Sequence, residues 1–125
     1  MPESPKIILI VEDESSLLLV LHDRLQEDGF KILQAKNGAE ALALSLAEHP
    51  DLILLDLLMP VMDGISMLKV LREDAWGKNA KIMVLTNLGG EEKLEEAKAL
   101  GVTDYLIKAD WKIEEVVQKI KNKIT

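Results

Sequence analysis

The sequence has 125 residues and a mass of 13.9 kDa, so the whole chain, residues 1–125, is expected to form one domain with a core over about 6–124. Acidic residues outnumber basic ones 22 to 15, and the net charge of −7 argues against binding of nucleic acid through a basic surface. The absence of cysteine excludes thiol chemistry, and no apolar run is long enough to cross a membrane, so we expect a cytoplasmic protein.

Short apolar runs alternate with helical patterns along the chain. Residues 7–11 are continuous and mostly β-branched, as in a strand that is buried on both faces. A helix is expected to begin at Ser15 or Ser16 and to end at Gly29, because glycine is the usual left-handed stop. The later elements expected are strands at 30–35, 52–55, 81–86 and 103–108, and helices at 39–47, 65–74, from about 91 to Gly101, and from about 113 to the end.

Helical spacing predicts which faces of three helices are buried. In the helix at 39–47 the predicted apolar face consists of Ala39, Leu42, Ala43, Leu46 and Ala47. In the last helix it consists of Ile113, Val116, Val117, Ile120 and Ile124. In the first helix the buried stripe is expected to contain Leu17, Leu18, Leu21 and Leu25.

The strict alternation of strands and helices predicts the fold class. It indicates an α/β protein with a doubly wound, five-stranded parallel sheet and five helices on its two faces. The common strand order for such a chain is 2-1-3-4-5, and function then lies at the carboxyl ends of the strands.

Polar residues follow the predicted strands at that edge. Glu12, Asp13 and Glu14 follow the first strand and Asp56 ends the third, so the order 2-1-3-4-5 brings carboxylates of neighbouring strands together. Two carboxylates about 4 Å apart repel by about 4 kcal/mol at an effective dielectric of 20, so such a cluster favours a cation. Oxygen ligands with open coordination positions suit Mg²⁺. Thr86 and Lys108 end the fourth and fifth strands at the same edge.

Each of these residues also has a purely structural interpretation. Asp13 and Glu14 could complement the positive end of a helix, and Asp56 could begin an Asx-turn. Thr86 could cap the next helix, and Lys108 could be an ordinary surface base. Their joint arrival at one edge of the sheet favours a functional site.

The residues Glu12-Asp13, the stretch at 56–64 (DLLMPVMDG), Thr86, Tyr105 and Lys108 together resemble a response-regulator receiver domain of the single-domain, chemotaxis-regulator type. The resemblance covers about residues 6–124 and implies a flavodoxin-like fold and a role in two-component signalling. It implies a signalling phosphoacceptor rather than an enzyme, one that catalyses only its own phosphoryl transfer and a slow autodephosphorylation. The implied partners are a histidine kinase or phosphotransfer protein and a downstream protein target. Neither nucleic acid nor a membrane is implied, and the chain would be a monomer or a weak, phosphorylation-dependent dimer.

The resemblance also implies a role for each site residue. Asp56 would accept the phosphoryl group from a phosphohistidine. Asp13, Asp56, the backbone carbonyl of Leu58 and Glu12 would hold Mg²⁺, the last of these directly or through water. Lys108 would pair with one phosphoryl oxygen and the Thr86 hydroxyl with another, while Tyr105 would be the aromatic switch.

Three positions depart from the family pattern. Ala109 follows Lys108 where the family usually has proline, so a cis peptide there would cost roughly 2.5–4 kcal/mol. Asn87 follows Thr86 where a small residue is usual, and Leu58 is apolar where many relatives are polar. None of the three removes a catalytic group.

Other function classes remain as alternatives. A phosphatase of the haloacid-dehalogenase type needs a second aspartate where Leu58 stands, and a flavodoxin-like electron carrier needs a phosphate loop that Glu12-Asp13-Glu14 would repel. A receiver-like interaction module that is never phosphorylated is the main rival. The sequence alone leaves open whether the chain is a stand-alone regulator or an excised receiver.

Two surfaces are predicted to meet partners. The output face is expected over the fourth helix, fifth strand and fifth helix, because the fourth helix is acidic and has few apolar anchors. Leu19 is predicted to point outward from the first helix, and the family pattern suggests that Leu18 is partly outward too. Both are candidate contacts for the kinase, although an isolated exposed leucine is also common.

Overall fold

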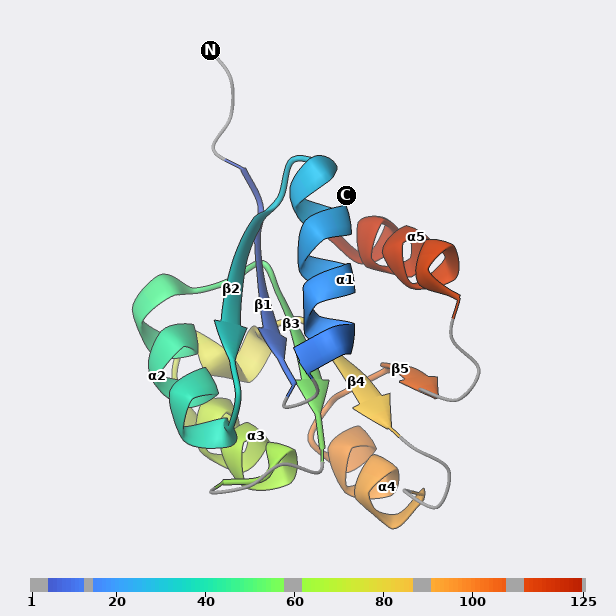
Figure 1. Cartoon of the computed structure of the whole chain (residues 1–125). Coiled ribbons are helices and arrows are strands. Elements are labelled where there is room, and N and C mark those ends of the chain that lie inside the picture. The colour runs from blue at the N-terminus through green and yellow to red at the C-terminus, as the bar shows by residue number, and fades with distance from the viewer. Residues whose placement is uncertain (1–4, 13–14, 58–61, 87–90, 108–111, 125) are drawn as a thin grey trace.

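The computed structural model describes residues 5–12, 15–57, 62–86, 91–107 and 112–124 (Figure 1). Of residues 15–18, 86, 91 and 107 it describes only the backbone. In this part of the chain a single parallel sheet has the strand order β2-β1-β3-β4-β5, so the predicted fold class is confirmed. The strands are β1 (Ile7–Val11), β2 (Lys31–Ala35), β3 (Leu52–Asp56), β4 (Ile82–Thr86) and β5 (Asp104–Ile107).

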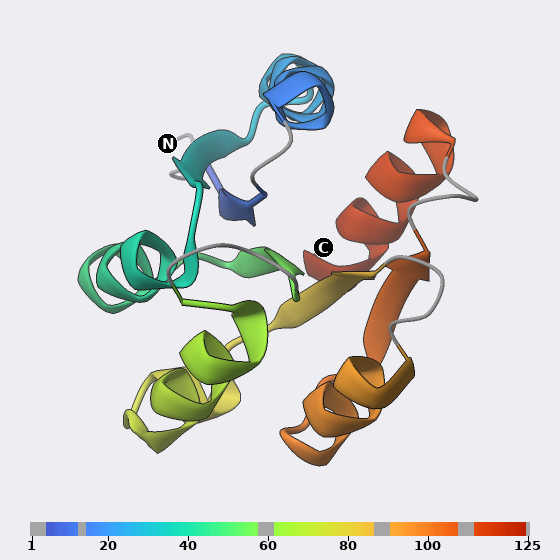
Figure 2. The same ribbon diagram turned by 60° about the horizontal axis from the view of Figure 1, so that its bottom comes forward.

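Five α-helices lie among the described residues and cover both faces of the sheet (Figures 1 and 2). They are α1 (Ser15–Glu27), α2 (Gly38–Glu48), α3 (Gly64–Glu73), α4 (Glu91–Ala99) and α5 (Ile113–Ile124). Helices α1 and α5 cover one face, and α2, α3 and α4 cover the other. The expected elements therefore all form, with bounds shifted by one or two residues.

The central strands are apolar on both faces because each face packs under helices. In β1, Ile8 and Ile10 pack with residues of α1 and α5, whereas Leu9 and Val11 pack with residues of α2, α3 and α4. The core thus has two layers, one on each side of the sheet. This is the burial that the unbroken apolar run at 7–11 predicts.

Helix ends follow local chemistry. The side chain of Asn37 accepts a hydrogen bond from the backbone N–H of Glu40 at 2.9 Å, which caps the start of α2. Gly29 has a φ of +96° just after α1, so the predicted glycine stop is confirmed.

The predicted face of α2 is wrong. Gly38, Ala41 and Ser45 are buried, whereas Ala39, Ala43, Leu46 and Ala47 of the predicted face are exposed and Leu42 is half-buried. The helix is apolar almost all round, so its periodicity does not single out one face. A backbone contact does: the N–H of Gly38 donates to the carbonyl oxygen of Met62 at 2.8 Å. A Cβ on Gly38 would lie 2.4 Å from that oxygen, so the contact requires glycine.

The faces of the other two helices agree with the prediction where their side chains are described. Val116, Val117, Ile120 and Ile124 are buried along α5, and Ile113 is half-buried. Leu21 and Leu25 are buried on α1, and Leu19 is 58% exposed. The side chains of Leu17 and Leu18 lie outside the described part.

A short 3-10 helix, η1 (Gly77–Asn79), follows α3 and was not predicted. Arg72 of α3 holds it in place, because its guanidinium donates to the carbonyl oxygens of Gly77 and Ala80 at 2.8 and 2.9 Å. The same guanidinium donates to the carbonyl oxygen of Leu100, just after α4, at 2.8 Å. Burial lowers the pKa of Arg72. No helix in the described ranges combines the length and the apolar character needed to cross a membrane.

Candidate functional site

The carboxyl ends of four neighbouring strands meet at one edge of the sheet. Val11 of β1 pairs with Leu55 of β3, so the next residues, Glu12 and Asp56, occupy adjacent positions. On the other side Asp56 pairs with Leu85 of β4, and Thr86 pairs with Ile107 of β5. The arrowheads of β1, β2, β3 and β4 point to this edge, in the lower part of Figure 1.

Two buried carboxylates lie at this edge. Glu12 is fully buried and Asp56 is 4% exposed, and among the described residues they are the only buried charged side chains. The ladder holds Glu12 in place, since its backbone N–H donates to the carbonyl oxygen of Ala35 at 3.1 Å. Burial of charge is costly, so two acids placed side by side in an apolar core indicate a functional site rather than a structural one.

The start of α3 packs closely on the backbone that carries Asp56. The N–H of Gly64 donates to the carbonyl oxygen of Leu57 at 3.1 Å. A Cβ on Gly64 would lie 2.5 Å from the carbonyl oxygen of Asp56, so only glycine permits this approach. Gly64 therefore lets the start of α3 pack against the end of β3. Its place in the sequence motif did not reveal this role.

Asp63 fixes the first turn of α3. Its Oδ1 accepts a hydrogen bond from the backbone N–H of Ser66 at 2.8 Å, which is an N-cap. That hydrogen bond lowers the pKa of Asp63 below its ordinary value. The residue before Asp63, Met62, contacts Gly38. This contact joins the start of α2 to the segment just before α3.

Several predicted site residues lie outside the described part of the chain. Asp13, Leu58 and Lys108 are among them, as are Asn87 and Ala109 at the positions that depart from the family pattern. Thr86 is described as the last residue of β4, without its side chain. The structure thus brings Glu12, Asp56 and the backbone of Thr86 to one edge. The roles of these residues remain predictions.

The donor set at this edge suits a hard divalent cation. Glu12 and Asp56 supply carboxylate oxygens from adjacent strands, whose backbones in any sheet lie about 4.8 Å apart. Oxygen ligands of this kind match Mg²⁺ rather than a thiolate-seeking metal. No group of three possible metal ligands gathers within the described residues, and Asp13, the third predicted carboxylate, is not among them.

Tyr105 lies on the exposed side of β5. The residue is 39% exposed, and the Nζ atoms of Lys98 and Lys119 lie 5.4 and 6.0 Å from the centroid of its ring. Lys119 also donates to the carbonyl oxygen of Tyr105 at 3.0 Å. The ring is therefore accessible on the surface formed by α4, β5 and α5.

Leu19 and Val20 form a small exposed apolar site on α1. Leu19 is 58% exposed, as predicted, and its neighbour Val20, which sequence reasoning missed, is also exposed. The signal for Val20 was the unbroken apolar run at 17–21, which is longer than one helical face can bury.

Comparisons with known proteins identify the family. A family model described as the response regulator receiver domain matches residues 8–121. The chain belongs to that family. The resemblance predicted from the sequence motif is thereby confirmed, and the phosphatase and electron-carrier alternatives are set aside.

Curated proteins of other organisms are similar in sequence to this chain. The receiver domain is 34% identical over 114 residues to sporulation initiation phosphotransferase F of Bacillus subtilis, covering 91% of this chain and 90% of that protein. Among other curated relatives, which are transcriptional regulators, the chain spans 38–46% of the length.

Solved structures agree with the fold. The chemotaxis response regulator CheY4 of Vibrio cholerae has a TM-score of 0.86 and 31% identity, with 95% of this chain and 98% of that chain covered. The receiver domain of sensor histidine kinase PA1611 of Pseudomonas aeruginosa has a TM-score of 0.85 and 28% identity, with 96% and 98% covered. That structure has a magnesium ion coordinated in its active-site cleft.

Proposed function

We propose that this receiver domain of a two-component system accepts a phosphoryl group on Asp56 from a histidine kinase or phosphotransfer protein. The observation that carries the proposal is the burial of Asp56 beside Glu12 at the carboxyl edge of the sheet. The strand ladder fixes the backbone of Asp56 at this edge, which places its carboxylate beside Glu12 and limits the positions that its oxygen can take.

The transfer is a displacement at phosphorus. A carboxylate oxygen of Asp56 attacks the phosphorus of the phosphohistidine, the P–N bond breaks, and the imidazole nitrogen keeps the electron pair. Such a transfer requires mainly positioning and neutralisation of charge. We assign one phosphoryl oxygen to the ammonium of Lys108 and another to the hydroxyl of Thr86.

The carboxylates would hold a metal ion. Glu12, Asp13, Asp56 and the backbone carbonyl of Leu58 are the residues we assign to Mg²⁺, which when bound supplies positive charge next to the transferred group. That charge would offset the repulsion between the neighbouring carboxylates of Glu12 and Asp56.

The phosphorylated state would be read on the surface formed by α4, β5 and α5. Thr86 ends β4 directly before the segment that leads to α4, and Tyr105 is accessible on β5. A shift of Thr86 toward the phosphoryl group would change the position of the Tyr105 ring. The surface presented to a downstream protein would then differ. We place the domain in the cytoplasm, as a monomer or a weak, phosphorylation-dependent dimer that catalyses only its own transfer and slow autodephosphorylation.

Phosphorylation by acetyl phosphate with Mg²⁺, followed by intact-mass measurement, tests the proposal. The wild-type chain should gain the mass of one phosphoryl group, and Asp56→Asn should gain none, because an amide is a poor nucleophile. Asp23→Asn is the matched control. Asp23 is an exposed aspartate in the second half of α1, and it does not lie at the carboxyl edge of the sheet. Wild-type protein that gains no mass would favour the unphosphorylated interaction module, and unchanged labelling of Asp56→Asn would move the acceptor elsewhere.

A further inference from the structure

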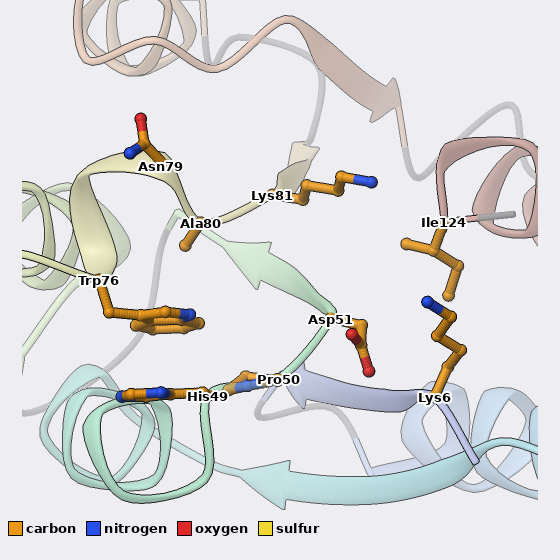
Figure 3. Close-up of a pocket in the computed structure, with 9 residues that line it drawn as sticks. All are labelled: Lys6, His49, Pro50, Asp51, Trp76, Asn79, Ala80, Lys81 and Ile124. Atoms are coloured by element: carbon orange, nitrogen blue, oxygen red, sulfur yellow. The ribbon is translucent and has the colours of Figure 1, made fainter. Parts of the chain in front are cut away.

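A pocket of about 200 Å³ lies at the opposite, amino-terminal edge of the sheet (Figure 3). Its floor is formed where β1, β3 and β4 begin, and its walls come from the end of α2, from η1 and from the end of α5. Water occupies about 30 Å³ per molecule, so the pocket has room for a small organic molecule rather than for a single ion.

Three charged side chains line the floor in the order of their strands. Lys6 precedes β1, Asp51 precedes β3 and Lys81 precedes β4, so the two lysines flank the aspartate. Asp51 already accepts a hydrogen bond from the backbone N–H of Ile7 at 2.7 Å. Within the described residues no ion pair joins it to either lysine. The pocket therefore has an excess of positive charge in a chain whose net charge is −7.

Hydrogen-bond donors around the pocket are available for a ligand. In the described part of the chain, the side chains of Lys6, Trp76 and Asn79 make no hydrogen bond to another residue. Lys81 uses one N–H, which donates to the carbonyl oxygen of Lys123 at 3.2 Å, and two remain. The edge of the Trp76 indole that carries its nitrogen faces the pocket (Figure 3).

The aromatic wall is held in a fixed orientation. The rings of His49 and Trp76 stack with their centroids 4.4 Å apart and an angle of 5° between their planes. His49 has a left-handed backbone, with a φ of +48°, which is uncommon for a residue other than glycine. The stack thus presents a rigid indole edge beside the two ammonium groups, instead of a side chain that must be ordered on binding.

We propose that this pocket binds a small phosphate monoester. The phosphate group lies within reach of Lys6 and Lys81, which suit phosphate as compact positive charges, and the ester group packs beside Trp76. A phosphate dianion balances the charge of two ammonium groups, whereas a ligand with one carboxylate would balance only one of them. The sheet separates this pocket from Asp56 by the full length of the strands, so binding here is independent of phosphoryl transfer.

The signal of the Trp76 indole N–H in two-dimensional NMR tests the proposal in the full-length protein. The chain has only two tryptophans, so Trp76→Phe assigns the signal. Titration with inorganic phosphate and with phenyl phosphate is done at constant ionic strength in EDTA, so that Mg²⁺ is absent. We expect a saturable shift of this signal and tighter binding of phenyl phosphate than of inorganic phosphate.

Charge variants separate a built site from general screening. Lys6→Gln and Lys81→Gln should each weaken binding about tenfold, the effect of losing one charge-assisted hydrogen bond. Lys78→Gln is the matched control, because Lys78 is an exposed lysine of η1 that does not line the pocket.

Three results would overturn the proposal. A shift that does not saturate, or that Lys6→Gln and Lys81→Gln reproduce unchanged, would leave only a general salt effect. Equal affinity for the two compounds would remove the monoester from the assignment.

Discussion

Asp63 illustrates how a single side chain supports the site without touching the chemistry. Its carboxylate caps α3 through Ser66, and the next residue, Gly64, lies against the backbone of Asp56 and Leu57. The cap therefore fixes the first turn of the helix that packs under the end of β3. The hydrogen bond from Ser66 also lowers the pKa of Asp63, so the cap is stronger when the carboxylate is charged.

Removal of this cap should lower stability in a pH-dependent way. Asp63→Ala should cost about 1 kcal/mol of unfolding free energy at neutral pH, the usual effect of losing an N-cap. Because the pKa of Asp63 is lowered in the folded state, its contribution is present above the unfolded-state pKa and is lost as the pH falls through the folded-state pKa. Urea unfolding at neutral and acidic pH measures the difference.

Asp63→Asn provides the control for the charge. Asparagine keeps a side-chain oxygen at the cap, so the variant should retain most of the stability at neutral pH but lose its dependence on this titration. If Asp63→Ala and the wild type differ equally at both pH values, the carboxylate does not act through its charge.

Leu19 on α1 allows a test of kinase docking. Its side chain is 58% exposed, so Leu19→Ser removes apolar surface without opening a cavity in the core. We expect transfer from the histidine kinase to slow several-fold, while phosphorylation by acetyl phosphate and stability stay unchanged. Val70→Ser, at an exposed valine of α3, is the matched control. Equal transfer rates from the kinase to wild type and Leu19→Ser would contradict the docking role.

Among the described side chains, α4 buries fewer than α3 and α5 do. Ala97 is the buried residue of its described side chains, and Leu94 and Leu100 pack only in part against the core. Glu92, Glu95 and Glu96 are exposed. At its carboxyl end, however, Arg72 donates to the carbonyl oxygen of Leu100, so this end has an anchor that the side-chain pattern does not suggest.

Phosphorylation should therefore change α4 unevenly. With the phosphoryl mimic beryllofluoride and Mg²⁺, amide exchange should change most in the first turn of α4, which follows the segment after Thr86, and least near Leu100. Hydrogen-exchange mass spectrometry with peptides from both halves of α4 measures this. Helix α2, on the same face of the sheet, is the internal reference. Identical exchange in α4 with and without the mimic would count against the switch.

Most elements could be predicted because their signals are local. The apolar run at 7–11, the glycine after α1 and the stripe along α5 each determine an element or a face from neighbouring residues alone. The face of α2 could not, since it depends on a backbone contact between Gly38 and Met62, which are far apart in sequence. Helix η1 depends likewise on Arg72, whose guanidinium has no periodic signature.

For the molecule as a whole, the strand order carries most of the functional information. It brings Glu12 beside Asp56 and gathers Lys6, Asp51 and Lys81 at the opposite edge. The first group could be predicted because strand order and the motif both point to it. The pocket could not, because its aromatic wall depends on the left-handed backbone of His49 and on η1.

The contact of Lys119 with Tyr105 also bears on how copies of the protein behave in concentrated solution. Strand β5 is an edge of the sheet, and an edge strand offers backbone groups to which a second chain can add. Lys119 occupies the carbonyl oxygen of Tyr105 and places a charge there, so it opposes strand addition. Lys119→Met should increase self-association in light scattering, relative to Lys112→Met at an exposed lysine just before α5. Equal scattering of both variants would show that Lys119 does not prevent strand addition at β5. The expected rise would show that this surface lysine helps to keep the protein from associating with itself.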